Sequence, residues 1–435
     1  MKNLLLLLLI NLCTISLNAQ WITTPIPASG YRYDDIYFMN PTVGWAVNYS
    51  LGNDGAVLKT TDGAASWQTL VNGSGAKFRD VGFVDSLNGF IGTLSTGYFP
   101  QDTVIMYKSN DGGLSWNDIP NFPGPRPAGI CGMFVINDST LYACGRYYGP
   151  SGFYKTTDKG DTWSYTDLSS YAGGIVDLHF FNKDTGIAVG GTLSNFLNGQ
   201  ARVIRTTDGG NTWTIVHTSS HPQEIGWKIS FPSPNVGYIS LESFRFGGPQ
   251  YFLKTIDGGV TWTDQQFMSS GTFDALGIGF ITDSIGWIGG NPSVFKTIDG
   301  GTSWTNDNFG TVVNRFRFFG DTLGYAAGQY VYKFDVGITS LTETLTTQSH
   351  ISICPNPFST LTAIAFKFDY RGVVKISIAD ISGRIVRTLT EKLYSGDQKY
   401  WWNGTNDAGT TVSEGIYFIT VETGQESKTL KVVKL

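Results

Sequence analysis

The sequence predicts an all-β protein, with a seven-bladed β-propeller followed by a small Ig-like β-sandwich. Three observations support this prediction. A turn motif that closes on Trp recurs six times, at spacings of 42 to 50 residues. Seven short β-type segments alternate with these turns, and no stretch shows helical periodicity of useful length. The last 85 residues lack the repeat and form strand-like runs separated by Gly, Asn and Asp.

The N-terminus is typical of a secretory signal peptide. Lys2 precedes a short apolar stretch from Leu4 to Ile10, and small and polar residues lead to Ala19. The apolar stretch is much shorter than the ~20 residues that a membrane span needs, and no other stretch could cross a membrane. We predict that residues 1–19 are removed after export to the periplasm. The protein is then expected to be secreted or held at the outer cell surface.

The composition narrows the possible functions. The 54 glycines and 14% aromatic residues fit a globular, turn-rich β protein. The net charge is −5 and no run is dense in Lys or Arg, so neither nucleic acid nor an anionic membrane is an expected partner. The four His residues are scattered, and no His, Cys and carboxylate cluster has ligand spacing. We expect no metal and no cofactor.

Each repeat predicts four short strands. The first carries Phe or Val, and the second carries an aromatic residue or Ile seven positions later, usually after Gly. The third strand leads to the Asp-Gly turn, and the fourth begins at the Trp of that turn. One such unit cannot bury both of its faces, so the units must stack as propeller blades. The seven pairs are Phe38/Trp45, Phe83/Phe90, Val135/Tyr142, Phe180/Ile187, Phe231/Tyr238, Phe280/Trp287 and Phe318/Tyr325.

The two ends of the repeat region are predicted to share one blade. The seventh unit ends at GQYVYKFDV and has no Trp strand of its own. Trp21, 46 residues before Trp67, supplies one from the other end of the region. The shared blade would close the ring and leave no open sheet edge. Residues 20–334 are therefore predicted to form seven blades.

The recurring turn has the pattern Thr/Ser-x-Asp-x-Gly-x-Thr/Ser-Trp, with Ala64 replacing the Gly in the first copy. An Asp that enters a tight turn can accept hydrogen bonds from the following backbone, while Gly takes the positive φ and Trp packs beneath. One carboxylate per turn is too few for a calcium site. We therefore predict six structural clasps, at Asp62/Trp67, Asp111/Trp116, Asp158/Trp163, Asp208/Trp213, Asp257/Trp262 and Asp299/Trp304.

This motif resembles the Asp-box (BNR) repeat of sialidases, sortilin-type receptors, some xyloglucan hydrolases and the photosystem II assembly/stability factors. In those families the box lies on a peripheral turn between the third and fourth strands, away from the functional site. Arginines are sparse here and the Arg-Ile-Pro pattern of sialidases is missing. The blades look most like the photosystem II assembly-factor group, over roughly residues 21–334. That resemblance implies binding rather than catalysis.

The propeller face opposite the Asp turns is the predicted binding face. Alignment on the repeat places seven residues near the mouth of the central channel: Asp35, Asp80, Gly132, Asp177, Lys228, Gly277 and Arg315. Neighbouring loops add Arg146, Tyr147 and Tyr148, and also Phe244 and Arg245. Mixed charge with aromatic side chains suits a peptide or glycan ligand. The alternative is that these charges cap strand ends or pair with one another.

Two functions remain open at this point. The first is a non-enzymatic binding or scaffold module for a protein or a glycan. The second is a glycan-active hydrolase, sialidase-like or another glycosidase, that uses carboxylates on the channel face. Asp35, Asp80 and Asp177 are the repeat-aligned candidates for it. Two of them ~5–10 Å apart across a sugar-sized cleft would favour the hydrolase, whereas charges that pair across a narrow channel would favour the binder.

Export places the remaining cysteines in an oxidising compartment. Cys131 and Cys144 flank two strand-like runs around a turn at Asn137 and Asp138. A hairpin of this kind could bring the two side chains close enough for a disulfide bond, and we expect this bond to form.

The C-terminal part consists of a polar, Thr-rich linker, residues 335–350, and a sandwich, residues 351–435. Its motifs comprise Pro355-Asn356-Pro357, Gly383-Arg384, Trp402 and Gly404, Gly415 and Tyr417, and the basic end at Lys431 and Lys434. This order resembles the type A C-terminal sorting domain of type IX secretion in Bacteroidetes-type bacteria. Cys354 departs from the family, which often has an aromatic residue there. The resemblance implies that the secretion machinery is a partner and that the tail directs passage through the outer membrane.

Overall fold

The computed structural model describes residues 20–49, 55–72, 76–94, 104–125, 129–145, 149–194, 196–245, 247–271, 273–320, 322–335, 350–423 and 427–435. The predicted signal peptide and residues 336–349 of the predicted linker lie outside these ranges. The chain divides into two compact units, Met1–Thr339 and Ser340–Leu435. None of the helices found among the described residues is long and apolar enough to cross a membrane.

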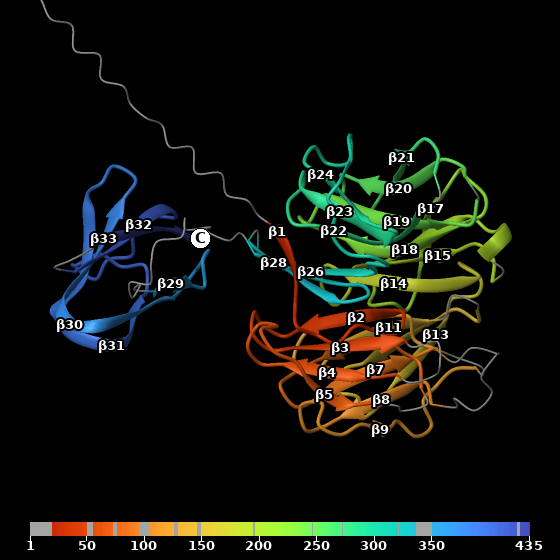
Figure 1. The fold of residues 1–435 in the computed structure, drawn as a ribbon, viewed down its shortest axis with the longest axis horizontal. Coiled ribbons are helices and arrows are strands. Elements are labelled where there is room, and N and C mark those ends of the chain that lie inside the picture. Colours follow the sequence, from red (N-terminus) through yellow and green to blue (C-terminus); the bar gives the residue numbers. More distant parts are fainter. Residues whose placement is uncertain are drawn as a thin grey trace, which may run out of the picture. The chain divides into compact units, whose positions relative to one another are not determined.

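The predicted fold class is confirmed: seven four-stranded antiparallel sheets form a propeller, and a further sheet builds the C-terminal unit (Figure 1). Within blades 1 to 6 the strands follow chain order, and the first strands of adjacent blades contact one another. Blades 1 to 3 are β2 (Arg32–Phe38), β3 (Gly44–Tyr49), β4 (Val57–Thr60), β5 (Gln68–Val71); β6 (Phe78–Phe83), β7 (Gly89–Thr93), β8 (Met106–Ser109), β9 (Asn117–Asp118); and β10 (Gly132–Val135), β11 (Leu141–Gly145), β12 (Gly152–Thr156), β13 (Ser164–Asp167). Blades 4 to 6 are β14 (Gly174–Phe180), β15 (Gly186–Gly191), β16 (Ala201–Thr206), β17 (Thr214–Thr218); β18 (Glu224–Ser230), β19 (Gly237–Ser243), β20 (Gln250–Thr255), β21 (Thr263–Met268); and β22 (Asp274–Phe280), β23 (Gly286–Asn291), β24 (Val294–Thr297), β25 (Thr305–Asn306).

The seventh blade joins the two ends of the propeller. Its sheet order is β1 (Gln20–Thr23), β28 (Val331–Asp335), β27 (Leu323–Ala327) and β26 (Arg315–Phe319). Trp21 pairs with Phe334, and its buried ring packs edge-on against Trp287 of blade 6. The first strand of the chain therefore supplies the missing outer strand, as the repeat arithmetic predicts.

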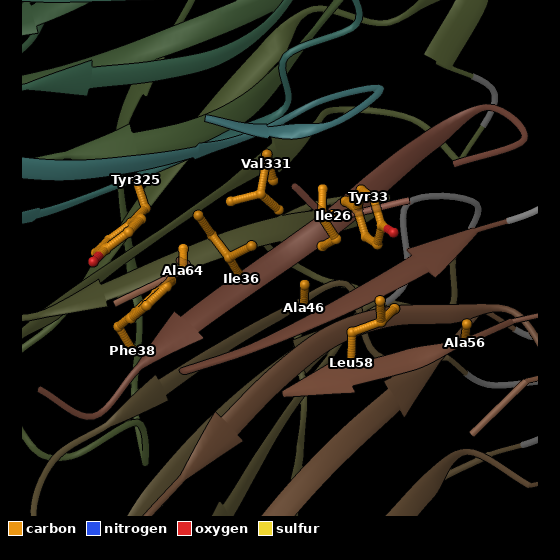
Figure 2. Close-up of a cluster of buried hydrophobic side chains, with 11 residues drawn as sticks. Ile26, Tyr33, Ile36, Phe38, Ala46, Ala56, Leu58, Ala64, Tyr325 and Val331 are labelled. Carbon is orange, nitrogen blue, oxygen red and sulfur yellow. The ribbon is translucent and has the colours of Figure 1, made fainter. Parts of the chain in front are cut away.

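Figure 2 shows the hydrophobic cluster that seals this junction. Phe38 of blade 1 stacks on Tyr325 of blade 7 with ring centroids 3.7 Å apart, and Tyr325 Oη donates to the Pro41 carbonyl at 2.9 Å. Ile36 and Val331 fill the space beside them. Packing between the first and last blades thus resembles packing between the other adjacent blades.

The same stacking explains the Phe-to-aromatic spacing of the repeat. Trp45 stacks on Phe83 of the next blade at 3.6 Å, and Tyr238 stacks on Phe280 at 3.5 Å. The Gly that precedes the aromatic residue is required by a close approach, since a Cβ on Gly44 would lie 2.5 Å from the Phe38 ring. The repeat therefore records both the contact between blades and the space that it needs.

The outer strand of each blade starts later than the sequence predicts. The fourth strand was expected to begin at the Trp of the Asp turn, but in all six copies it begins at the next residue. Each Trp belongs to the turn instead, because the last ladder pair joins the residue after it to a Lys or Arg of the third strand. The Trp residues to which this correction applies are Trp67, Trp116, Trp163, Trp213, Trp262 and Trp304.

The C-terminal unit is a five-stranded antiparallel arrangement of β29 (His350–Cys354), β30 (Thr362–Asp380), β31 (Ile385–Trp402), β32 (Gly415–Thr423) and β33 (Ser427–Lys434). Some of the strand-like runs that the sequence separates at Gly, Asn and Asp join into two long strands, β30 and β31, of 19 and 18 residues. Register shifts, such as the one between Phe368 and Gly372, let the pairing continue where the sequence predicts a break. Trp402 and Ile376 lie in the core of this unit.

Candidate functional site

The six Asp turns share one hydrogen-bond pattern. In the fourth, Thr206 Oγ1 donates to Asp208 Oδ1 at 2.9 Å, and Thr212 donates to the carboxylate from its backbone at 2.9 Å and from Oγ1 at 2.6 Å. The bonds from Thr212 lower the pKa of Asp208 below its ordinary value. Trp213 Nε1 then donates to the Gly210 carbonyl at 3.1 Å. The same aspartate bonds recur at Asp62, Asp111, Asp158, Asp257 and Asp299.

The Trp indoles of the other turns are less uniform than the aspartates. In three of them the indole N–H donates to the carbonyl three residues earlier, as Trp213 does: Trp116 at 3.0 Å, Trp262 at 3.3 Å and Trp304 at 3.1 Å. Trp163 lacks this bond, since its buried Nε1 has no hydrogen-bond partner among the described residues. Trp67 donates instead to Thr24 Oγ1 at 3.2 Å. The clasp therefore depends on the aspartate bonds, which all six turns keep, and only partly on the indole bond.

Each of these Trp rings also packs edge-on against a Phe at the edge of a blade core. Some reach the preceding blade, as Trp163 does on Phe90 at 5.6 Å and Trp304 on Phe252 at 5.6 Å. Others pack on a Phe at the end of the first strand of their own blade or directly after it, and these are Trp67 on Phe38 at 6.2 Å, Trp116 on Phe83 at 5.8 Å and Trp262 on Phe231 at 5.9 Å. The rings therefore pack beneath their turns, as the motif predicts.

Each carboxylate of these turns accepts hydrogen bonds from its own turn. Among the described residues there is no group of three or more His, Cys, Asp or Glu that could hold a metal ion. Trp213 also packs edge-on against Phe153 of the preceding blade at 5.5 Å. These contacts join the turn to its own strand end and to a neighbouring blade.

The aligned charged residues meet at the propeller axis, where they form what we call the channel ring: Asp35, Asp80, Asp177, Lys228 and Arg315. Arg315 Nε donates to Asp35 at 2.7 Å, Nη2 to Asp80 at 3.1 Å and Nη1 to Asp177 at 2.9 Å. The four partners come from blades 7, 1, 2 and 4, and such contacts are possible only at the axis. All are buried.

A bulge in the first strand turns four of these side chains inward, those of Asp35, Asp80, Asp177 and Lys228. Tyr33 pairs with Asn48 and Asp35 with Val47, so Asp34 is an extra residue in its strand. The same shift occurs at Asp80 and Asp177 and near Lys228. A bulge redirects the side chain that follows it. At Gly132 the ring has no room for a side chain, because a Cβ there would lie 3.0 Å from Asp177.

Burial and the neighbouring charges shift the pKa values of the channel ring. Burial opposes ionisation of Asp35, but Arg315, Arg317 and Lys228 together with a hydrogen bond from Asp80 outweigh it and lower the pKa to about 2. Burial, together with the charge of Asp35, raises the pKa of Asp80 well above its ordinary value. Burial and the charge of Arg315 lower the pKa of Lys228 to about 8.

A second layer, one residue earlier on each first strand, closes the channel further. Asp34 Oδ1 accepts from Arg32 Nε at 2.8 Å and from Arg79 Nη1. Asn314 donates to the Asp34 carbonyl at 2.7 Å and accepts from Trp227 Nε1 at 2.6 Å. This layer was not predicted from the sequence. The sequence feature that could have revealed this layer is the position just before each channel-ring residue, which is polar in blades 1, 2 and 7.

The channel ring is therefore placed differently from the predicted binding face. Asp35, Asp80 and Asp177 lie within the interior and are at most 1% exposed. Their charges pair with Arg315 across the channel, which is the alternative that the sequence left open. A sugar cannot reach carboxylates that are buried and paired in this way.

Phe244 and Arg245 lie at an accessible site, which we call the Phe244 pocket. It has a volume of about 380 Å³ and lies on the side opposite the Asp turns. Phe244 and Phe273 form apolar walls, and Arg245, Gln250 and Asp274 add polar groups. The loop after β19, the start of β22 and a short 3₁₀ helix, Phe196–Asn198, meet here. Arg146, Tyr147 and Tyr148, predicted for the same face, lie outside the described residues.

The polar groups of the Phe244 pocket are held in place but not all satisfied. Arg245 Nη2 donates to Glu224 Oε2 at 3.1 Å and to the Pro249 carbonyl at 3.2 Å. Gln250 is 2% exposed, and its Oε1 has no hydrogen-bond partner among the described residues. An unsatisfied buried acceptor costs about 1–3 kcal/mol. A donor on a bound molecule would remove that cost.

A second opening lies on the side of the Asp turns and was not predicted from the sequence. This groove has a volume of about 260 Å³, with Tyr37, Phe134, Phe319 and Arg317 among its lining residues. Arg317 is anchored by Asp35 at 3.4 Å and by the Ile36 carbonyl at 3.1 Å. The sequence feature that could have revealed this groove is the residue on either side of each repeated Phe or Val.

The expected disulfide between Cys131 and Cys144 is not present, and both side chains are buried. The Cys131 amide donates to the Cys144 carbonyl at 2.8 Å, so the hairpin does bring the two residues together. Burial raises the pKa of the Cys144 thiol well above its ordinary value. Because a disulfide forms through the thiolate, this environment opposes the reaction.

The motif residues of the C-terminal unit tie its two ends together. Asn356 donates to the Lys431 carbonyl and accepts from the Val433 amide, both at 2.8 Å. Gly404 has φ +69, and a Cβ there would lie 2.5 Å from Lys434 Cε. Buried Trp402 donates to the Thr405 carbonyl at 2.9 Å. The other motif residues lie at turns and strand ends. Pro355 and Pro357 flank Asn356, Gly383 has φ +83, and Arg384 pairs with Asp380. Gly415 begins β32, and Tyr417 Oη donates to the Ser413 carbonyl.

Comparison with known proteins supports both folds. The family model for the FlgD Ig-like domain matches residues 369–427. No curated protein matches the chain. YCF48 bound to a D1 peptide is similar in structure, with a TM-score of 0.53, 18% identity, and coverage of 73% of this chain and 94% of that one.

Two larger proteins are also similar. A GH74 xyloglucanase from Xanthomonas campestris has a TM-score of 0.52 at 12% identity, covering 80% of this chain and 59% of its own. PorZ, a surface component of the type-IX secretion system of Porphyromonas gingivalis, has a TM-score of 0.51 at 13% identity, covering 95% and 61%. At these identities the likeness shows the fold alone. The neighbours include both binding proteins and glycan-active enzymes.

Proposed function

We propose that the propeller is a non-enzymatic module that binds an extended peptide segment of a partner protein in the Phe244 pocket. One observation carries the proposal. The channel carboxylates are paired internally, whereas the Phe244 pocket combines accessible apolar walls with a fixed cation and an unsatisfied amide oxygen. The first arrangement favours stability, and the second favours recognition.

The chemistry of the Phe244 pocket suits a peptide. Phe244 and Phe273 can enclose an apolar side chain, and Arg245 can donate to a main-chain carbonyl or a carboxylate. Gln250 Oε1 can accept from a backbone N–H group, and exposed Asp274 offers a negative charge at the rim. YCF48, which shares the fold, is described as bound to a peptide. This similarity of fold supports the proposal without identifying the sequence that binds.

A hydrolase is the weaker candidate. Glycosidases place two carboxyl groups on either side of a bond in the substrate, with space for the sugar between them. Here Arg315 occupies the space between Asp35, Asp80 and Asp177. The similarity to a xyloglucanase supports a shared fold and does not supply a cleft at these residues.

The test is a selection of random displayed peptides on the full-length protein, followed by affinity measurement on selected peptides by titration calorimetry. We expect Phe244→Ala and Arg245→Gln each to weaken binding by at least ~10-fold, since each removes a wall or a charge-assisted hydrogen bond. Leu114→Ala, which changes an exposed side chain on an Asp turn, is the matched control and should bind as the wild type does. If no peptide is selected, or if both pocket variants bind normally, the proposal is wrong.

We further propose that the C-terminal unit carries the propeller through the outer membrane by type IX secretion. The Asn356, Trp402, Gly404 and Lys434 contacts support this, since they make the motif residues one folded framework. Deletion of residues 351–435 is expected to leave the protein in the periplasm of a type IX-competent host. Fractionation and immunoblotting would measure this. Normal surface or medium levels of the truncated protein would contradict the proposal.

A further inference from the structure

A large groove runs between blades 6 and 7, separate from the Phe244 pocket. This blade 6–7 groove has a volume of about 630 Å³, within the range of small-molecule sites. Blade 7 contributes β1 and the turn before β28, and blade 6 contributes Pro292–Ser293 and residues 307–311. None of these residues belongs to the channel ring or to an Asp turn.

Two short elements of blade 6 lie beside the groove. Its outer strand, β25, has two residues, as β9 of blade 2 does, whereas β17 and β21 have five and six. The loop between β23 and β24 consists of Pro292 and Ser293 alone. Residues 307–311, which follow β25, line the groove.

The lining combines aromatic faces with neutral hydrogen-bonding groups. Phe309 stacks on Trp21 with ring centroids 4.9 Å apart, and both Phe309 and Tyr330 are half-buried, so part of each ring faces solvent. Thr311 Oγ1 and Gln329 Oε1 lie 3.2 Å apart and face the same groove. Among the described lining residues there is no Lys, Arg or His, and Asp307 is the one carboxylate.

The groove also contains polar groups that lack a complete set of partners. Trp21 is 5% exposed, and its Nε1–H has no acceptor among the described residues. A buried donor of this kind costs about 1–3 kcal/mol unless something accepts from it. Asp307 is fixed through one oxygen, which accepts from Trp287 Nε1 at 2.8 Å. The groove therefore has a donor and an oriented acceptor beside its aromatic faces.

We propose that the blade 6–7 groove binds a neutral oligosaccharide. A sugar ring presents C–H groups to one face, which pack on an aromatic ring, and hydroxyl groups at its edge, which both donate and accept. The hydroxyls can accept from Trp21 Nε1 and donate to Asp307 and Gln329. The lack of a cation in the described lining disfavours an anionic ligand, for which the nearby carboxylate would be repulsive.

The experiment is saturation-transfer NMR on the full-length protein, with cellotetraose, maltotetraose and chitotetraose as neutral probes and tetragalacturonate as the anionic probe. We expect transfer to at least one neutral probe and much weaker transfer to tetragalacturonate. Tyr330→Leu, which keeps apolar volume but removes the ring, and Gln329→Ala should each weaken binding of that probe by at least ~10-fold. Phe244→Ala is the control, because it changes the other pocket.

The outcomes separate this inference from the proposed function. Loss of sugar binding in the groove variants, with the wild-type melting temperature retained and Phe244→Ala unaffected, would support it. It is overturned if no neutral probe receives saturation. It is also overturned if both groove variants bind normally or if tetragalacturonate binds as well as the neutral probes. Peptide binding at the Phe244 pocket would stand in each of these cases.

Discussion

Replacing Arg315 with Leu is expected to lower the free energy of unfolding of the propeller by about 3–5 kcal/mol. Arg315 donates to Asp35, Asp80 and Asp177 in a site from which water is excluded. Without the guanidinium, the carboxylates of Asp35 and Asp177 stay in the interior, with Lys228 and the half-buried Arg317 as the remaining cations beside them. Removing one partner of a buried ionic group costs more than the group contributes when intact, because the remaining charges stay buried.

Chemical unfolding of the full-length protein, followed by tryptophan fluorescence, measures this effect. Arg317→Leu is the matched control, since Arg317 also bonds Asp35 but is half-buried and bonds it at 3.4 Å. We expect it to cost about 1 kcal/mol. Adding Asp177→Asn to Arg315→Leu should recover part of the loss, because the two changes share one network. Equal losses in the free energy of unfolding for Arg315→Leu and Arg317→Leu would show that the buried ion pairs of Arg315 stabilise the propeller no more than the half-buried ion pair of Arg317.

The repeat makes the propeller predictable, and the reason is physical. The spacing between Trp residues reflects four strands and their turns. The Gly that usually precedes the aromatic residue of the second strand reflects its close contact with the Phe of the first strand. Ring closure by Trp21 follows because six Trp turns for seven units leave one outer strand to be supplied from elsewhere. The convergence of Asp35, Asp177 and Arg315 also follows, since equivalent positions on the first strands lie at one height along the axis.

The state of those residues could not be predicted in the same way. Alignment of the repeats predicts where these residues lie along the propeller axis but not how wide the channel is there. The bulge at Asp34, which turns Asp35 inward, leaves no distinct sequence signal. Both pockets are lined by segments outside the repeated strands and turns: the loop after β19 and the chain after β25. Such departures differ from blade to blade, so alignment averages them away. The prediction of a disulfide bond between Cys131 and Cys144 was wrong for a related reason. Strand pairing predicts that the two residues are close, but not how burial affects their thiols.

A fall in stability between pH 4.5 and pH 7 is expected from Glu224, a fully buried group behind the Phe244 pocket. Burial raises the pKa of this carboxyl from 4.5 to about 7, although Arg245 opposes the shift. Between these two values the folded state keeps a proton that the unfolded chain has lost. The contribution is therefore fully present below pH 4.5 and is lost as the pH rises to 7. A shift of this size corresponds to about 3 kcal/mol.

Other groups change the total curve, so the informative quantity is the difference between wild type and Glu224→Gln. Burial lowers the pKa of His179 to about 4, which makes stability rise between pH 4 and 6.5 and partly masks Glu224. Asp35 and Lys228, with pKa values of about 2 and 8, act outside this window. Subtracting the two unfolding curves at each pH cancels these shared terms.

The Glu224→Gln variant should gain stability relative to the wild type as the pH rises, by about 3 kcal/mol from pH 4.5 to 7, because Gln carries no proton to lose. Glu422→Gln, at an exposed position of the C-terminal unit, should show no such gain. Parallel curves for Glu224→Gln and the wild type would mean that Arg245 keeps Glu224 ionised throughout. The Phe244 pocket would then carry a fixed ion pair rather than a titrating one.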